Sequence, residues 1–171
     1  MVHSVELLFD PDTDSAVRRI WDELSAAGIR SQAANRAPTN RPHVTLTVAE
    51  SMDDAVDAAL HPVLARLPLT CRIGAPMLFG GRSITVVRLI VPSAELLALH
   101  ADVHRNCLPH MPDGPLPNAR PGTWTPHVTL ARRLPPDALA RAVPRLGRDL
   151  PARLTGLRHW DGDAKVEHLI G

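Results

Sequence analysis

The pentapeptide Pro-His-Val-Thr-Leu occurs twice in the chain, at 42–46 and again at 126–130. Each copy places one imidazole and one hydroxyl two residues apart. Two imidazoles with ordinary pKa values of about 6.5 can divide acid–base work at neutral pH, one as a neutral base and the other as a protonated acid. Opening a cyclic phosphodiester needs such a pair, because one ring accepts a proton from the attacking water while the other protonates the departing ribose oxygen.

The spacing also predicts where these side chains point. Successive side chains of a β-strand alternate between its faces, so His43 and Thr45 share one face, as do His127 and Thr129. In-line displacement would place the two imidazoles on opposite sides of the phosphorus. The threonine hydroxyls could then donate to the non-bridging oxygens as negative charge develops. This chemistry requires no metal or cofactor, and the predicted result is one cleft lined by two histidines and two threonines.

Simpler explanations exist for each residue alone. A single histidine on a strand is usually structural or exposed, and threonine is common in strands because it is β-branched. Five identical residues in matching settings instead favour an internal duplication, which brings equivalent positions together.

Hydrophobic periodicity and turn residues predict similar elements in both halves. In the first half we expect a strand at 2–9, a helix at 11–28, the motif strand at 43–49 and a helix from a capping box at Ser51 and Asp54 to residue 67. Strands at 69–78 and 83–91 follow, separated by the Gly80-Gly81 turn.

The second half repeats this order. We expect a helix at 93–108, a connection rich in Pro and Gly at 109–122, the second motif strand at 125–132, a helix at 136–146, and strands at 152–160 and 165–170. The order predicts an α+β fold in which residues 1–171 form a single domain. Its two pseudo-symmetric lobes, related by internal duplication, would each be an antiparallel sheet with helices packed outside, around a central cleft. The connection at 109–122 is a candidate lid over that cleft.

Composition limits the class of protein. The 171 residues, 44% of them hydrophobic, suffice for one buried core. No apolar stretch approaches the ~20 residues that span a bilayer, and no signal peptide is evident, so we expect a cytoplasmic monomer. The net charge of +1 argues against binding long nucleic acid by phosphate neutralisation alone. Cys71 and Cys107 lack paired spacing and predict neither a disulfide nor a thiolate metal site.

The two motifs resemble those of the two-histidine phosphoesterases, whose signature is a pair of His-x-Thr/Ser-hydrophobic segments about this far apart. Within that superfamily the chain is similar to the bacterial 2′-5′ RNA ligases, also described as RNA 2′,3′-cyclic phosphodiesterases. The resemblance implies a two-lobed α+β fold and metal-independent hydrolysis of a 2′,3′-cyclic phosphate to a 2′-phosphate. Reverse ligation to a 2′-5′ linkage belongs to part of the group. The resemblance assigns the acid role to His43 and the base role to His127.

Four further residues are candidates for binding substrate. The resemblance implies a phosphate contact for Arg132, although strand alternation places it opposite His127 unless the strand bulges or ends. Arg41 precedes the first motif and offers a guanidinium suited to phosphate. Trp124 and Phe9 are candidates for stacking on a base, with burial in the core as the alternative.

The substrate class is less closely defined. The chain has five aromatic residues, and 47–50 reads Thr-Val-Ala-Glu where bacterial relatives commonly carry an aromatic residue or Leu-Gly. Single-stranded RNA is usually held by stacking on aromatic side chains, so this scarcity favours a small cyclic nucleotide over an extended RNA 3′ end. The alternatives are the same fold acting on another cyclic or 2′-5′-linked nucleotide, and a non-catalytic nucleotide- or RNA-binding module. The intact His and Thr of both motifs count against the last.

The remaining histidines suggest no metal site. His100 and His104 lie four apart on an expected helix, but the segment lacks the glutamate of His-Glu-x-x-His, so a solvated helix face is expected there. The others have no partner pattern and remain unassigned: His3, His61, His110, His159 and His168.

Overall fold

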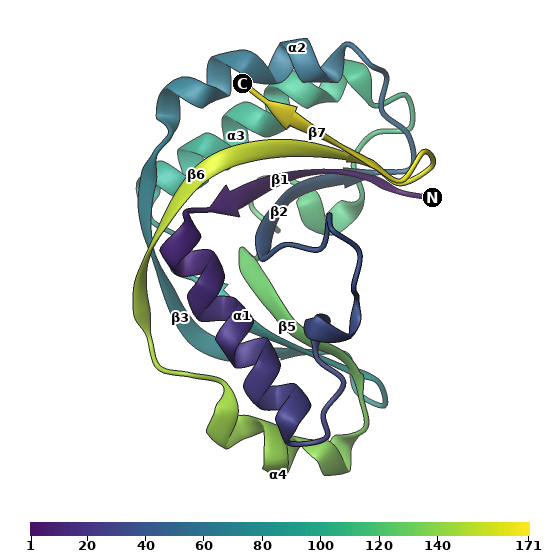
Figure 1. Cartoon of the computed structure of the whole chain (residues 1–171). Coiled ribbons are helices and arrows are strands. Elements are labelled where there is room, and N and C mark those ends of the chain that lie inside the picture. The colour runs from purple at the N-terminus through teal and green to yellow at the C-terminus, as the bar shows by residue number, and fades with distance from the viewer.

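The computed structural model describes residues 1–171 as one curved antiparallel sheet with helices outside it (Figure 1). The strands are β1 (His3–Phe9), β2 (His43–Ala49), β3 (Leu69–Phe79), β4 (Ile84–Ile90), β5 (His127–Leu134), β6 (Leu150–Asp161) and β7 (Val166–Ile170). The helices are α1 (Pro11–Ala26), α2 (Val56–Leu60), α3 (Ala94–Cys107) and α4 (Leu139–Ala142). The predicted α+β class is confirmed.

The strand order is β2-β1-β6-β3-β4-β5, with β7 added to β6. If β1 is exchanged with β4, β2 with β5 and β3 with β6, the result is the same order read from the other end. A pseudo-two-fold arrangement has this property. The two halves nevertheless share one hydrogen-bonded sheet, because residues Leu69–Ile73 of β3 pair with Leu150–Leu154 of β6. The origin of this symmetry in an internal duplication stays a prediction.

The two motif strands lie at opposite ends of the strand order, yet the sheet curves so far that β2 and β5 approach each other at its centre (Figure 1). The long helices cross between the halves. The helix after β1, α1, packs against β5, and the indole N–H of Trp21 donates to the Thr129 carbonyl at 3.1 Å. The helix after β4, α3, packs against β2. Each half therefore supports the motif strand of the other.

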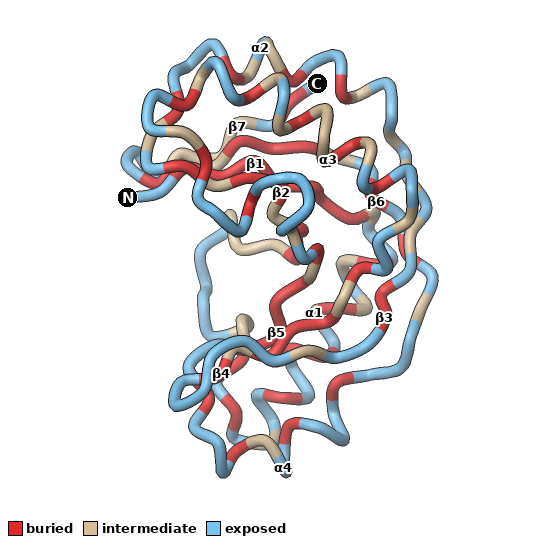
Figure 2. The backbone as a smooth tube through the Cα atoms, turned by 180° about the vertical axis from the view of Figure 1, so that it is seen from behind, coloured by how far each residue is buried: buried red, intermediate tan, exposed pale blue.

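A continuous apolar core runs through both halves. Its 35 buried residues come from all four helices and all seven strands, and Figure 2 shows burial concentrated along the strands and on the helix sides that face them. Every residue of β1 is buried. The Asp10 side chain accepts from the Thr13 N–H and caps α1, and Gly28, at φ +76°, lies just beyond its end at Ala26.

Two predicted helices are much shorter than expected. The segment 51–67 contains only α2 followed by 3-10 turns at His61–Arg66, and 136–146 contains only α4 between 3-10 turns. Pro62 and Pro144 explain this, because a proline in a helix interior removes a backbone donor and interrupts α-helical hydrogen bonding. The capping box was also wrong, since α2 begins after Ala55 with no side-chain cap. None of the helices has the length and apolar character that crossing a membrane requires.

Candidate active site

Both motif histidines are the first residues of their strands, and both rings are held in the same way. His43 Nδ1 lies 2.7 Å from the carbonyl of Arg41, and His127 Nδ1 lies 2.7 Å from the carbonyl of Thr125. A carbonyl oxygen only accepts, so each Nδ1 carries the hydrogen and donates it. Each Nε2 is thereby left for chemistry. The symmetry of the fold thus extends to the tautomer of the two imidazoles.

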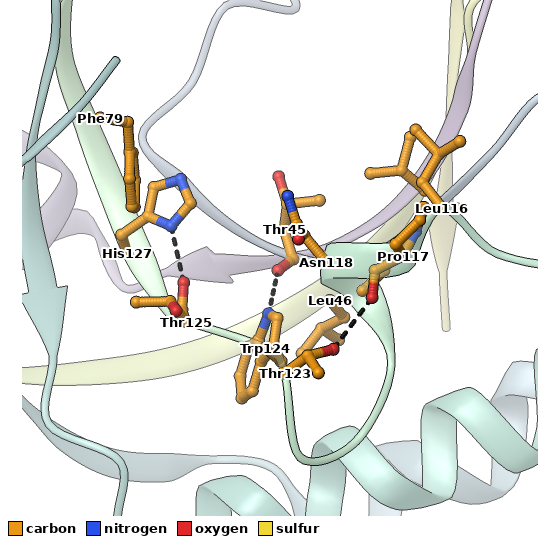
Figure 3. A pocket seen from close by; sticks show the side chains of 12 residues that line it. Thr45, Leu46, Phe79, Leu116, Pro117, Asn118, Thr123, Trp124, Thr125 and His127 are labelled. Atoms are coloured by element: carbon orange, nitrogen blue, oxygen red, sulfur yellow. Dashed lines mark hydrogen bonds between the residues drawn. The ribbon is translucent and has the colours of Figure 1, made fainter. Parts of the chain in front are cut away.

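His127 lines a cleft of about 710 Å³ that is built from both motifs (Figure 3). Thr45 of β2 lines its opposite side, and residues of the 109–122 connection, including Leu116 and Pro117, form one wall. That connection is fastened to β2 by the Leu116 N–H, which donates to the Val48 carbonyl at 2.8 Å. Its action as a lid stays a prediction, but it does lie at the cleft.

Burial lowers the pKa of His127 below the ordinary histidine value. The nearby charges of Arg132 and His43 lower it further, and together these effects outweigh the hydrogen bond to the Thr125 carbonyl, which acts in the opposite direction. The edge of the Phe79 ring contacts the imidazole, with centroids 4.9 Å apart, and excludes water from one side. His127 is therefore neutral at pH 7, as a general base must be.

Replacing Phe79 by Ala is expected to raise the pKa of His127 toward the unperturbed value of about 6.5, because water would reach the ring and solvate its cationic form. An NMR titration of the imidazole C–H signals measures this directly. Leu116→Ala opens the same cleft away from the ring and serves as the control. An unchanged titration in the Phe79 variant would show that the aromatic ring does not desolvate His127.

His43 lies beside a buried carboxylate instead. Glu6 Oε1 of β1 is 3.6 Å from His43 Nε2. Burial alone would raise the pKa of Glu6, but the charges of His43 and Arg158, with a hydrogen bond from Ser4 at 2.7 Å, lower it overall. Glu6 is therefore ionised at neutral pH. An ionised carboxylate thus lies within 4 Å of the Nε2 atom of the first motif histidine.

A closed ring of polar contacts fixes this arrangement. The Arg158 guanidinium donates to Glu6 at 2.8 Å and to Glu167 at 2.8 Å. Arg41 donates to the other oxygen of Glu167 at 2.8 Å, and its carbonyl holds His43. The orientation of the imidazole and the charge of its neighbour thus depend on one network.

The strand carrying the second motif bulges, which decides the position of Arg132. The pairing of β5 with β4 shifts register between Thr129 and Ala131, so that Leu130 and Ala131 are both buried in the core. The extra residue reverses the alternation of faces. Arg132 consequently lines a second pocket, of about 680 Å³, together with His43. Simple alternation would have placed this guanidinium on the other side.

The two threonines are not equivalent. Thr45 is half-buried and lines the cleft with His127. Thr129 is buried and lines neither of the pockets that hold the motif histidines. The predicted role of Thr129 in phosphate binding therefore needs a small opening of β5, whereas Thr45 is already accessible.

Trp124 has a mixed position. It lines the cleft, but its N–H donates to the Thr45 carbonyl at 2.9 Å and its ring stacks on His100 with centroids 3.9 Å apart. One aromatic face is thus occupied. His100 is buried, with Nε2 3.0 Å from the carbonyls of Leu46 and Ala119, so the expected solvated helix face was wrong at this position. The His100 Nε2–H thus lies between a carbonyl of β2 and a carbonyl of the 109–122 connection, and helps to hold the two together.

Two predicted substrate contacts lie elsewhere. Phe9 is 7% exposed in the apolar core and lines neither pocket that holds a motif histidine. The guanidinium of Arg41 is drawn to Glu167 and, with Phe9, borders a smaller pocket of about 310 Å³. Arg41 contributes to the site only through its backbone carbonyl. Neither side chain lines a pocket that holds a motif histidine, and their contact with substrate stays a prediction.

Three residues of the site were missed from sequence. Phe79 ends β3 directly before the Gly80-Gly81 turn, an exposed place for an aromatic ring. Glu6 is a buried carboxylate followed by apolar residues in β1, and Arg158 is its buried partner on β6. A charged residue inside an apolar run is the signal that could have identified the last two.

One protein family and several solved structures are similar to this chain. A family model described as the 2′-5′ RNA ligase superfamily matches residues 11–162. A search of curated protein sequences found no match. Among solved structures, TT0787 of Thermus thermophilus has a TM-score of 0.63 at 16% identity, covering 100% of this chain and 96% of that one.

Two other solved structures share the fold at lower similarity. Escherichia coli LigT in its apo form has a TM-score of 0.52 at 13% identity, covering 99% of this chain and 94% of its own. Kluyveromyces marxianus Usb1 with uridine monophosphate has a TM-score of 0.51 at 14% identity, covering 99% and 97%. With the family model matching most of the chain, the protein belongs to the 2′-5′ RNA ligase superfamily of two-histidine phosphoesterases.

Proposed function

We propose that the protein is a metal-independent phosphodiesterase that opens 2′,3′-cyclic phosphates of RNA ends or small nucleotides to 2′-phosphates. The observation that carries the proposal is that His43 and His127 are held in the same way, each with Nδ1 bound to a backbone carbonyl and Nε2 left for chemistry. His127 has a lowered pKa, and His43 lies beside the ionised Glu6. Family membership supports a phosphoesterase reaction.

His127 acts as the base in this proposal and His43 as the acid. His127 Nε2 takes a proton from water as the water oxygen bonds to phosphorus. The bond from phosphorus to O3′ breaks on the opposite side, and His43 Nε2 gives its proton to that oxygen. Arg132, Thr45 and Thr129 bind the non-bridging oxygens as their charge increases. A 5′-hydroxyl in place of water would give the reverse 2′-5′ ligation.

The proposed substrate is an RNA 3′ end or a small cyclic nucleotide. Phe79, 36% exposed, offers a ring edge beside His127, whereas Trp124 has one face covered by His100. So few free aromatic faces suit one or two bases better than a long strand. Kluyveromyces marxianus Usb1, which shares the fold, was solved with uridine monophosphate, a ligand of that size.

The first test is incubation of the protein with a short RNA ending in a 2′,3′-cyclic phosphate, with EDTA present. We expect conversion to the 2′-phosphate, resolved from the 3′-phosphate by chromatography. A parallel reaction with a cyclic mononucleotide separates small from extended substrates. Binding of either compound without turnover would favour the alternative of a non-catalytic module and contradict the proposed reaction.

Replacing Thr45 by Val should lower kcat about 10²–10³-fold, because the variant keeps the shape of the side chain but loses the donor to the developing oxyanion. Steady-state kinetics on the cyclic mononucleotide measure the effect. Thr47→Val on the same strand is a matched control, since that hydroxyl is buried without a hydrogen-bond partner. Equal rates for the two variants would remove Thr45 from the phosphate site.

A further inference from the structure

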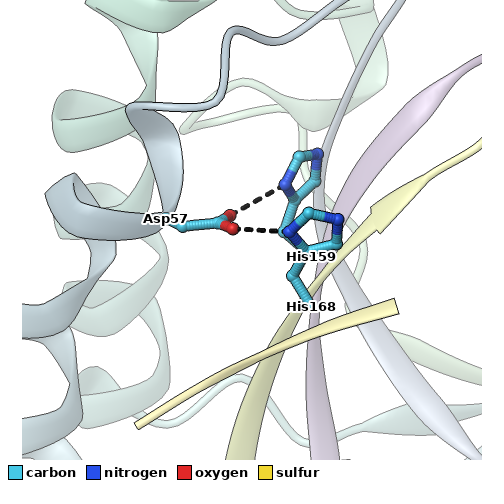
Figure 4. Close-up of side chains that lie close together, drawn as sticks. All are labelled: Asp57, His159 and His168. Carbon is cyan, nitrogen blue, oxygen red and sulfur yellow. Dashed lines mark hydrogen bonds and ion pairs between the residues drawn. The ribbon is translucent and has the colours of Figure 1, made fainter. Parts of the chain in front are cut away.

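Three titratable side chains that the proposed reaction does not use meet on the helix-covered face of the sheet. His159 of β6 and His168 of β7 are directly paired across the two strands. Asp57, in the first turn of α2, reaches both of them: its two oxygens lie 2.8 Å from His159 Nδ1 and 2.7 Å from His168 Nδ1 (Figure 4). A β-hairpin and a helix about 100 residues before it in the sequence thus converge on one point.

The convergence has the donor atoms and spacing of a metal site. One carboxylate oxygen and two imidazole nitrogens lie within 4.8 Å of one another. Two imidazoles with one carboxylate form a ligand set that suits zinc and similar borderline divalent ions. His159 is 3% exposed, whereas Asp57 and His168 are 27% and 38% exposed, so a fourth position faces water. We propose that Asp57, His159 and His168 bind a divalent transition-metal ion of the zinc class, with water completing the tetrahedron.

A second layer of groups supports the assignment. His159 Nε2 lies 3.1 Å from His3 Nδ1, and His3 Nε2 lies 3.4 Å from an Asp163 carboxylate oxygen. With a metal on His159 Nδ1, the His159 Nε2–H donates to His3 Nδ1, and the His3 Nε2–H donates to the Asp163 carboxylate. Metal-bound histidines are commonly oriented in this way.

The site is separate from the catalytic cleft. The neighbours of His159 on β6 face the other side of the sheet, where Arg158 and Trp160 line the pocket that holds His43. The proposal therefore does not depend on the phosphodiesterase reaction, which is expected to proceed in EDTA. A bound ion would join α2, which has no side-chain cap, to β6 and β7.

Isothermal titration of the full chain with zinc, after EDTA treatment and removal of the chelator, tests the proposal. We expect one ion per chain, with proton release on binding because a ring proton is displaced. Asp57→Asn and His168→Ala should each abolish this binding. His3→Gln, which alters only the second layer, should weaken it about 10–100-fold. Circular dichroism establishes that each variant is folded.

Controls exclude other zinc ligands in the chain. His61→Ala removes an exposed imidazole whose one contact is the Ala58 carbonyl, and Cys71→Ser removes the more accessible thiol; both should bind as the wild type does. Zinc binding that survives in both Asp57→Asn and His168→Ala overturns the proposal. So does binding that Asp163→Asn abolishes but His168→Ala does not, since the ion would then lie at His3, Asp161 and Asp163.

Discussion

Replacing His127 by Ala is expected to lower kcat on a 2′,3′-cyclic phosphate about 10²–10⁴-fold, the usual contribution of a positioned general base. Phe79 lies against the ring and the Thr125 carbonyl occupies Nδ1, so the substitution removes the one ring nitrogen left for proton transfer, Nε2. Single-turnover rates measure the chemical step without the effects of binding. The enzyme is then in excess of the substrate and above the dissociation constant of the complex.

The pH profile assigns the roles of the two histidines. The rate falls as pH drops through the pKa of the base, and burial lowers the pKa of His127, so the acid limb of kcat/KM should lie below the ordinary histidine value. The residual activity of His127→Ala should lack this limb, whereas that of His43→Ala should keep it. The reverse pattern would exchange the acid and base assignments. His61→Ala, far from the cleft on an exposed turn, provides the control.

The largest expected effect on stability comes from Arg158→Leu. The substitution leaves the carboxylate of Glu6 buried without its cation and removes one partner of Glu167. Breaking a buried pair from one side costs about 3–5 kcal/mol of unfolding free energy. Urea denaturation at pH 7 measures the loss. Arg18→Leu is the matched control, because Arg18 and its partner Asp14 are far more exposed to water, and it should cost about 0.5 kcal/mol or less.

The pH dependence of that loss identifies its cause. In the wild type the pKa of Glu6 is lowered, so its ionisation stabilises the fold above the unfolded value of about 4.3, and this contribution is lost as pH falls through the folded pKa. In Arg158→Leu burial acts with less opposition, and the carboxyl should prefer its neutral form. The difference between variant and wild type should therefore shrink as pH falls, and adding Glu6→Gln should recover part of the loss at pH 7. A deficit that is constant with pH would indicate lost packing instead.

Short-range patterns in the sequence were sufficient to predict the fold class and several of the helices and strands. The repeated pentapeptide, the alternation of strand side chains and the position of turn residues predicted the α+β class, the extents of β2 and β3, and the placement of α1 and α3. These features depend on residues close to one another along the chain, which is why a single sequence is sufficient to predict them. The lengths of two helices were wrong for a local reason too, since apolar periodicity predicted them through Pro62 and Pro144, where α-helical hydrogen bonding is interrupted.

Tertiary structure alone decided how these elements meet. The curvature of one continuous sheet brings its terminal strands β2 and β5 together, and a bulge in β5 turns Arg132 toward His43. Burial places Glu6 with Arg158, and strand register pairs His159 with His168 beneath Asp57. Such contacts join residues far apart in the chain, and their free energy depends on register, burial and packing of the whole molecule. Periodicity therefore identified the two histidines, whereas the fold determined their different surroundings, an aromatic ring beside His127 and a buried carboxylate beside His43.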